Sequence, residues 1–268
     1  MHNPINRTNN EMFFQIIALL VSIILVHTLY VILVRPSAES TMLLHMNMAA
    51  AGEAYVPPRS FTIIIKDFEQ EACFILMLWA MAIMTYKVRV GMDERSMLDQ
   101  PLIDINEGSK ILPEDASQYN RPIQALSSVQ QALLLPRALS TALLRFEVTK
   151  SVQSATDAVE SVCDTENERL DSELSMIRYI TWAIPSIGFI GTVRGIGAAL
   201  GQAHEAMEGN IAGVTSSLGV AFNSTFVALL ISMVVMFFMH QLQLQQERLV
   251  LDSHHYCENK LLRFLKAN

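Results

Sequence analysis

Residues 184–200 read IPSIGFIGTVRGIGAAL, an apolar stretch that also contains one proline, four glycines, one threonine and one arginine. At about 1.5 Å of rise per residue, a helix of this length crosses most of a hydrocarbon core about 30 Å thick. Gly188, Gly191 and Gly195 lie three and four positions apart and therefore share one face of such a helix. Because small residues on one face let two helix backbones approach closely, the stretch predicts a tightly packed membrane helix.

The composition of the whole chain agrees with this prediction. Of its 268 residues, 51% are hydrophobic and 17% are charged, and the mean hydropathy is +0.31. Soluble domains carry about 25% charged residues, so we expect a membrane protein with a sizeable soluble part. The net charge of −7 offers no broad basic surface, and a nucleic-acid partner is therefore not expected.

No motif predicts catalysis, a cofactor or a bound metal. The sequence lacks a Walker loop, a nucleophile elbow and an HExxH pattern, so we predict that the protein is not an enzyme. Its three cysteines, Cys73, Cys163 and Cys257, lie far apart and outside any CxxC pattern. This arrangement indicates neither a disulfide framework nor a zinc site, and it favours a cytosolic location for the soluble part.

Four apolar stretches predict an all-α, polytopic fold with about four transmembrane helices. They cover residues 13–34, 72–86, about 177–200 and about 211–239. The second is short, but Glu69 and Glu71 precede it and Lys87 and Arg89 follow it, as at the ends of a span. The short link between the last two predicts an antiparallel helical hairpin.

The cationic residues beside the spans predict the orientation. They cluster around residues 87–176, so this segment and both termini are expected in the cytoplasm. Arg35, Arg59 and Lys66 in the predicted outer loop run against that rule. The predicted domains are an N-terminal membrane region at 1–86, a cytoplasmic helical segment at 87–176, a transmembrane hairpin at 177–240 and a cytoplasmic extension at 241–268.

Apolar stripes predict that the hairpin continues into a cytoplasmic bundle. Val148, Val152, Ala155, Val159 and Val162 recur at helical spacing, and Leu170, Leu174 and Ile177 resume the stripe after Glu166 interrupts it. One long amphipathic helix is therefore expected to run into the third span. After the fourth span, Leu242, Leu249 and Tyr256 recur every seven residues.

Polar residues inside the last two spans admit two interpretations. The fourth span contains Ser217, Asn223, Ser224, Thr225 and Ser232. Such side chains face either a neighbouring helix or a hydrated path. In the third span Pro185 frees one carbonyl, which a neighbour must satisfy, and the Thr192 hydroxyl can bond back to the preceding turn.

Two motifs resemble a known family. AIPSIGFIGTVRGIGAAL, at residues 183–200, resembles the proline-led G-L-L-G-T-V-x-G-I signature of the MotA/TolQ/ExbB proton-channel family, and AFNSTFVAL, at 221–229, resembles its ALxxTAxGL motif. The resemblance covers about residues 140–265. It departs from the family pattern at Arg194, where the transport branch often has an aromatic or aliphatic residue, and at Phe222, Phe226 and Ala228. It also departs in an additional N-terminal span that the transport branch lacks.

The resemblance implies a subunit of a proton-driven membrane motor or energy-transducing channel in the bacterial inner membrane. It implies a homopentamer around a dimer of single-span partners, with Thr192 and Thr225 facing the ion path. It also implies that Pro185 matches the family's proline near the start of that helix. Because neither the spans nor their motifs supply a suitable acid, we expect the partner helix to carry an intramembrane Asp, as in ExbD/TolR/MotB-like proteins.

The candidate residues follow from these arguments. The ion-path candidates are Thr192, Thr225, Asn223 and Ser224, and the helix-packing candidates are Pro185, Gly188, Gly191 and Gly195. Arg194 lies about 24 Å along the helix from Arg178, so it either reaches the outer interface or exerts electrostatic control on the ion path. His27, on the first span, is interpreted as a helix-interface histidine rather than a proton carrier.

Two alternative functions and two weaker sites stay open. A non-conducting scaffold would also use glycine packing, and a signalling receptor would sense through the outer loop. Met42, His45, Met46 and Met48 contain soft metal ligands, but a Met-rich interfacial helix is favoured. His254 and Cys257 are interpreted as part of a solvated surface.

Overall fold

The computed structural model describes residues 4–50, 60–103, 105, 109–209 and 211–267. Within these ranges the chain forms helices and no β-strand, apart from one isolated bridge between Ile111 and Leu265. The prediction of an all-α fold is therefore confirmed.

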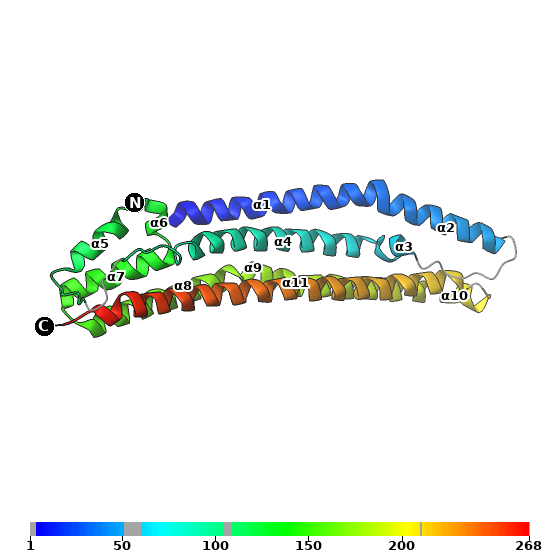
Figure 1. Ribbon diagram of the computed structural model, residues 1–268. Coiled ribbons are helices and arrows are strands. Elements are labelled where there is room, and N and C mark those ends of the chain that lie inside the picture. Colours follow the sequence, from blue (N-terminus) through cyan, green and yellow to red (C-terminus); the bar gives the residue numbers. More distant parts are fainter. Residues whose placement is uncertain (1–3, 51–59, 104, 106–108, 210, 268) are drawn as a thin grey trace. The chain divides into compact units, whose positions relative to one another are not determined.

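Figure 1 follows the helices along the chain. Their bounds are α1 Pro4–Leu29, a π-helical turn Tyr30–Val34, α2 Arg35–Ala50, α3 Phe61–Ile65, α4 Phe68–Arg95, α5 Ala116–Gln124, α6 Ser128–Gln131, α7 Leu134–Thr149, α8 Val152–Glu173, α9 Ser175–Gly201, α10 Ala203–Met207, α11 Ala212–Lys260 and a final 3-10 turn Leu262–Phe264.

The chain divides into two compact units. The apolar unit comprises residues 10–84 and 176–239, and the bundle unit comprises residues 1–9, 85–175 and 240–268. The chain passes between units beside the predicted boundaries at 86, 176 and 240, although the cellular location of each predicted domain stays a prediction.

Four helical stretches of the described chain are long and apolar enough to cross a membrane, as predicted. They are Glu11–Leu44, Phe68–Arg95, Val152–Gly201 and Ala212–Phe264, with mean hydropathies of 2.8, 1.6, 1.4 and 2.2. The predicted second span, residues 72–86, lies within α4, which begins at Phe68 and ends at Arg95. Glu69 and Glu71 therefore lie in the first turn of this helix instead of preceding it.

α9 and α11 form the predicted antiparallel hairpin, and they run side by side in Figure 1. Gly188 lies against Ala228, Gly191 against Ser224 and Gly195 against Ala221. Residue numbers therefore increase along α9 while they decrease along the facing part of α11, as in an antiparallel pair. The link between them is partly ordered, because it contains the short helix α10. This hairpin and the start of α4 position the residues of the candidate site.

The core of the bundle unit lies between α7, α8 and the end of α11. Leu139, Leu143 and Phe146 of α7 are fully buried there, together with Val159 of α8 and Cys257 of α11. The burial of Cys257 contradicts its prediction as a surface residue. Its small apolar side chain lies on the inward face of α11, where it packs like an alanine.

The predicted helix over residues 148–177 is interrupted at two points. Lys150 adopts the left-handed conformation and ends α7, and Ser151 caps α8 with its hydroxyl. Val148 therefore lies in the last turn of α7. It is 81% exposed and does not belong to the apolar stripe of α8. A turn at Leu174 then separates α8 from α9, but the two helices follow each other directly.

Glu166, which interrupts the apolar stripe of α8, is buried and paired. Its carboxylate accepts hydrogen bonds from Arg137 of α7, at 2.6 Å, and from Arg169 of its own helix. The residue is only 2% exposed, and removing water from a carboxylate is costly unless cations replace it. The two arginines explain why the core accepts an acid at this position.

Candidate functional site

Three glycines of α9 make the closest approach between α9 and α11. A Cβ atom added to Gly188 would lie 2.4 Å from Ala228 Cβ, and one added to Gly191 would lie 2.5 Å from Ser224 Cβ. At Gly195 it would lie 2.7 Å from the backbone nitrogen of Ala221. Because real Cβ contacts are longer than 3.0 Å, no larger residue fits at these positions without displacing a helix.

Gly197 and Gly201, two further glycines four positions apart, do not take part in this contact. A Cβ atom on Gly197 or Gly201 would meet nothing within 4 Å in the described chain. Both residues are exposed, so close packing at these two positions is not provided by the chain itself.

Thr192 and Thr225 meet across this helix contact. Their hydroxyls are within hydrogen-bond distance of each other. The Thr192 hydroxyl also lies 3.0 Å from the carbonyl oxygen of Ala221, and the Thr225 hydroxyl lies 3.1 Å from that of Gly188. The sequence predicted that each threonine faces a polar environment; the structure adds that the two form one pair, with each hydroxyl directed at the opposite backbone.

Pro185 is compensated by a serine of α11. Proline lacks an N–H group, so the carbonyl of Thr181, four residues earlier, loses its usual helical partner. The hydroxyl of Ser232, which is only 5% exposed, donates to this oxygen at 3.3 Å. The predicted neighbour that satisfies the freed carbonyl is thus Ser232.

Ser224 and Asn223 do not join the threonine pair. The Ser224 hydroxyl donates to the carbonyl of Val220 at 2.8 Å and accepts from the side chain of Gln70, at 3.4 Å. Asn223 is two positions from Thr225 and therefore lies on another part of the helix surface. It is half-buried and shares no hydrogen bond with the pair in the described chain.

Arg194 is bound by acids of its own chain, which neither sequence interpretation included. Its Nε and Nη2 atoms donate to the two carboxylate oxygens of Glu69 at 2.7 and 2.8 Å, a bidentate pair. Asp67 lies 4.0 Å away. The arginine side chain remains 50% exposed. Its direction is fixed by the bond to Glu69 of α4, while the other side of the guanidinium stays open to the surroundings of the chain.

A cavity of about 300 Å³ opens beside this ion pair. Arg194 and Asp67 line it together with Arg35, Ala38, Glu39, Met42, Lys66 and Phe68. Burial raises the pKa of the Asp67 carboxyl, and Glu69 acts in the same direction, whereas Lys66 and Arg194 lower it. The cavity thus places the partly desolvated carboxyl of Asp67 beside Lys66 and Arg194, just before the first residue of α4.

Glu71 forms a second ion pair, which involves His27. One Glu71 oxygen lies 2.7 Å from His27 Nδ1, and the other accepts from Arg35 at 2.5 Å. His27 and Arg35 are eight positions apart, which in an α-helix would place them about 80° apart. The wider π turn at Tyr30–Val34, between them, reduces that angle. His27 is therefore held at a helix interface, as the sequence suggested.

A protein-family model matches the segment that contains the threonine pair. The family model described as the MotA/TolQ/ExbB proton channel family matches residues 129–254, which contain the whole of α9 and both threonines. This match supports the family that the two sequence motifs suggested. No curated protein and no solved structure matches the chain. The acids that bind Arg194 and His27 precede the segment matched to the MotA/TolQ/ExbB family.

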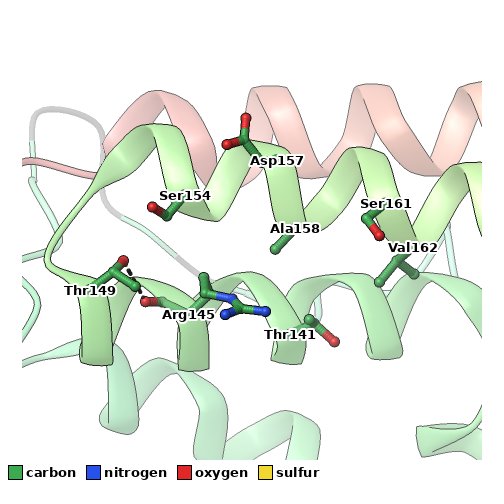
Figure 2. A pocket seen from close by; sticks show the side chains of 8 residues that line it. All are labelled: Thr141, Arg145, Thr149, Ser154, Asp157, Ala158, Ser161 and Val162. Carbon is green, nitrogen blue, oxygen red and sulfur yellow. Dashed lines mark hydrogen bonds between the residues drawn. The ribbon is translucent and has the colours of Figure 1, made fainter.

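The MotA/TolQ/ExbB segment also contains a polar groove of about 300 Å³ between α7 and α8. Figure 2 shows its eight lining residues, with Arg145 on α7 and Asp157 on α8. The Thr149 hydroxyl donates to the carbonyl of Arg145 at 2.8 Å, and the Thr141 hydroxyl donates to the carbonyl of Arg137 at 2.7 Å. These hydroxyl protons are used within α7, and the groove has one residue of each charge.

The suggested soft-metal cluster is only partly described. Met42 lines the cavity near Arg194, where its sulfur lies 3.9 Å from Lys66 Nζ. The side chains of His45, Met46 and Met48 lie outside the described residues.

The sequence reasoning missed the polar first turn of α4. Glu69 and Glu71 were interpreted as the flank of a span, and Gln70 was not considered. Their side chains bind other helices: Glu69 binds Arg194, Gln70 binds Ser224, and Glu71 binds both His27 and Arg35. The available signal was a run of three polar residues directly before an apolar helix. Each makes contact with a different part of the apolar unit.

Proposed function

We propose that this chain is a subunit of a proton-driven membrane motor or energy-transducing channel, and that the threonine pair borders its ion path. The supporting observation is the position of Thr192 and Thr225. They meet at the closest approach of α9 and α11, within the residues that the family model matches. A pair of hydroxyls held by backbone carbonyls has a fixed geometry, which an ion path requires.

The hydrogen bonds determine what this pair can do chemically. A threonine hydroxyl has one proton to donate and two lone pairs that accept. One hydroxyl donates its proton to the other, and the second proton is left for a backbone carbonyl, at 3.0 Å from Thr192 or 3.1 Å from Thr225. The lone pairs that remain can accept a hydrogen bond from water or from a protonated carboxylic acid. The pair therefore suits a proton carrier that passes in its neutral form.

The acid itself is proposed to come from a partner protein. Proton movement at membrane depth normally requires a titratable group. Glu69 and Glu71 lie in α4, but side chains of the same chain bind both oxygens of each carboxylate. Neither acid contacts the threonine pair in the described chain. A single-span partner with an intramembrane Asp, of the ExbD/TolR/MotB type, would supply the missing group.

The assembly and location complete the proposal. Large apolar side chains on α9 and α11, including Phe189, Val193 and Phe226, are 57–65% exposed in the single chain. Such faces suit lipid or neighbouring copies. We propose a homopentamer around a partner dimer in the bacterial inner membrane, with the bundle unit and both termini in the cytoplasm.

The test is proton flux in vesicles that contain this chain and its single-span partner. Thr192→Val and Thr225→Val keep the shape of the side chain but remove the hydroxyl. Each variant is expected to assemble normally and to lose flux by at least about tenfold, the factor that one ordinary hydrogen bond supplies. Thr215→Val is the matched control, because Thr215 is an exposed threonine of α11 whose hydroxyl, among the described residues, bonds to the carbonyl of Ile211 alone.

The outcomes separate the proposal from its alternatives. Loss of flux in the two site variants, with normal flux in Thr215→Val, supports the ion path. Full activity in both site variants contradicts it and favours a scaffold in which the hydroxyls only join two helices. Neutralising the partner's Asp should stop flux in the unmodified chain.

A further inference from the structure

Gln70 joins α4 to α11 in the interior of the apolar unit. Its side chain is fully buried, at 0% exposure. The carboxamide nitrogen donates to two oxygens, the carbonyl of Ile64 at 3.1 Å and the hydroxyl of Ser224 at 3.4 Å. Because successive helical residues point about 100° apart, Gln70 reaches α11 while its neighbours reach other helices.

The carboxamide oxygen of Gln70 is a buried acceptor without a donor in the described chain. Leaving such an acceptor unpaired lowers stability, and an apolar side chain of similar size would avoid this loss. Packing alone therefore does not explain why the position holds glutamine. An apolar residue could make neither bond of the carboxamide nitrogen, and the bond to Ser224 is the one that reaches α11.

Ser224 lies where α4, α9 and α11 meet, next to the threonine pair in sequence. A Cβ atom on Gly191 would lie 2.5 Å from Ser224 Cβ and 3.1 Å from the Glu69 side chain. The Ser224 proton is donated to Val220 within α11, so the Ser224 oxygen is free to accept from Gln70. Rotating α11 about its axis would stretch this bond and would also move Thr225 away from Thr192.

We propose that Gln70 is a positioning residue for the threonine pair. Its amide holds Ser224 and thereby sets the rotation of α11 at which the Thr225 hydroxyl faces Thr192. This inference rests on the proposed function of the pair. It extends the site to α4, which precedes the segment matched by the family model.

The experiment is a double-mutant cycle on proton flux, measured in vesicles with the single-span partner. Gln70→Leu and Ser224→Ala each remove the bond, and each is expected to lower flux about tenfold. The loss in the double variant should be smaller than the product of the two single losses, because both changes remove the Gln70–Ser224 bond, although Gln70→Leu also removes the bond to the Ile64 carbonyl. Gln202→Leu is the matched control: Gln202 also contacts a serine of α11, Ser217, at 3.4 Å, but two turns away from Thr225.

Assembly and thermal unfolding are measured on every variant. A role in positioning predicts lower flux with unchanged assembly, together with normal flux in Gln202→Leu. If Gln70→Leu does not assemble, Ser224→Ala decides, since it introduces no new bulk. Normal flux in Ser224→Ala, or losses that multiply to about a hundredfold in the double variant, would overturn the inference.

The Thr225→Val variant separates this inference from the proposed function. If Thr225→Val loses flux and Gln70→Leu keeps it, the threonine pair borders the ion path and only the role of Gln70 is refuted. If Thr225→Val and Thr192→Val both keep flux, the proposed function fails, whatever Gln70 does.

Discussion

Gly195→Ala tests the contact on which the whole site depends. The added Cβ would lie 2.7 Å from the backbone nitrogen of Ala221, which is 0.7 Å short of the 3.4 Å where ordinary contact begins. It would also lie 2.8 Å from the carbonyl oxygen of Ser217. Backbone atoms cannot rotate away as a side chain can, so α9 and α11 must separate.

The magnitude follows from a matched pair of variants. Gly197→Ala lies on the same helix, and its Cβ would meet nothing within 4 Å of the described chain. Both substitutions gain the same helix propensity, about 1 kcal/mol, which cancels in the comparison. The difference that remains is the cost of overpacking, about 1–3 kcal/mol. Gly195→Ala should therefore unfold more easily than Gly197→Ala by this amount.

The assay is reversible unfolding of the purified protein in detergent, followed by far-UV circular dichroism. Thr192 is three residues before Gly195, so separation of the helices should also weaken the hydroxyl pair and lower proton flux in Gly195→Ala. Equal unfolding midpoints for the two variants would refute the packing of α9 against α11 at Gly195, and with it the geometry assigned to the threonine pair.

Three further predictions concern neighbouring residues. Ser232→Ala should lower the free energy of unfolding by about 1–3 kcal/mol, because the carbonyl of Thr181 loses its donor, and the same detergent assay measures it. Burial raises the pKa of the Asp67 carboxyl above 3.8. The protonated carboxyl therefore stabilises the folded protein fully below pH 3.8, and this stabilisation declines as the pH rises through the raised pKa. Asp67→Asn should remove this decline from unfolding midpoints measured across pH. Arg194→Glu and Glu69→Arg should each lower proton flux, and the double exchange should restore it if their ion pair sets the electrostatics of the site; no restoration would show that Arg194 acts independently of Glu69.

Much of the fold follows directly from residue spacing. Four long apolar stretches predict four membrane helices, and glycines three and four positions apart predict the face on which α9 packs. The order of the two motifs also predicts the family. These inferences succeed because they depend on local periodicity, which a sequence displays without any knowledge of what lies opposite.

Partners across helices could not be predicted in this way. Nothing in the sequence connects Pro185 with Ser232, or Ser224 with Gln70, since these pairs are separated by dozens of residues or more. The partners of Glu69 and Glu71 at the start of α4 could not be predicted for the same reason. Charged residues near a span resemble an interfacial flank until their partners are known.

The sequence by itself determined that this is an all-α membrane protein with a glycine-packed hairpin, because hydropathy and helical spacing are local properties. Only the tertiary structure decided that Thr192 and Thr225 form one pair and that Arg194 is bound by Glu69. It also showed that Gln70 ties α4 to α11. The physical reason is that a hydrogen bond requires two groups at a defined distance and direction, and that geometry exists only after the helices have packed.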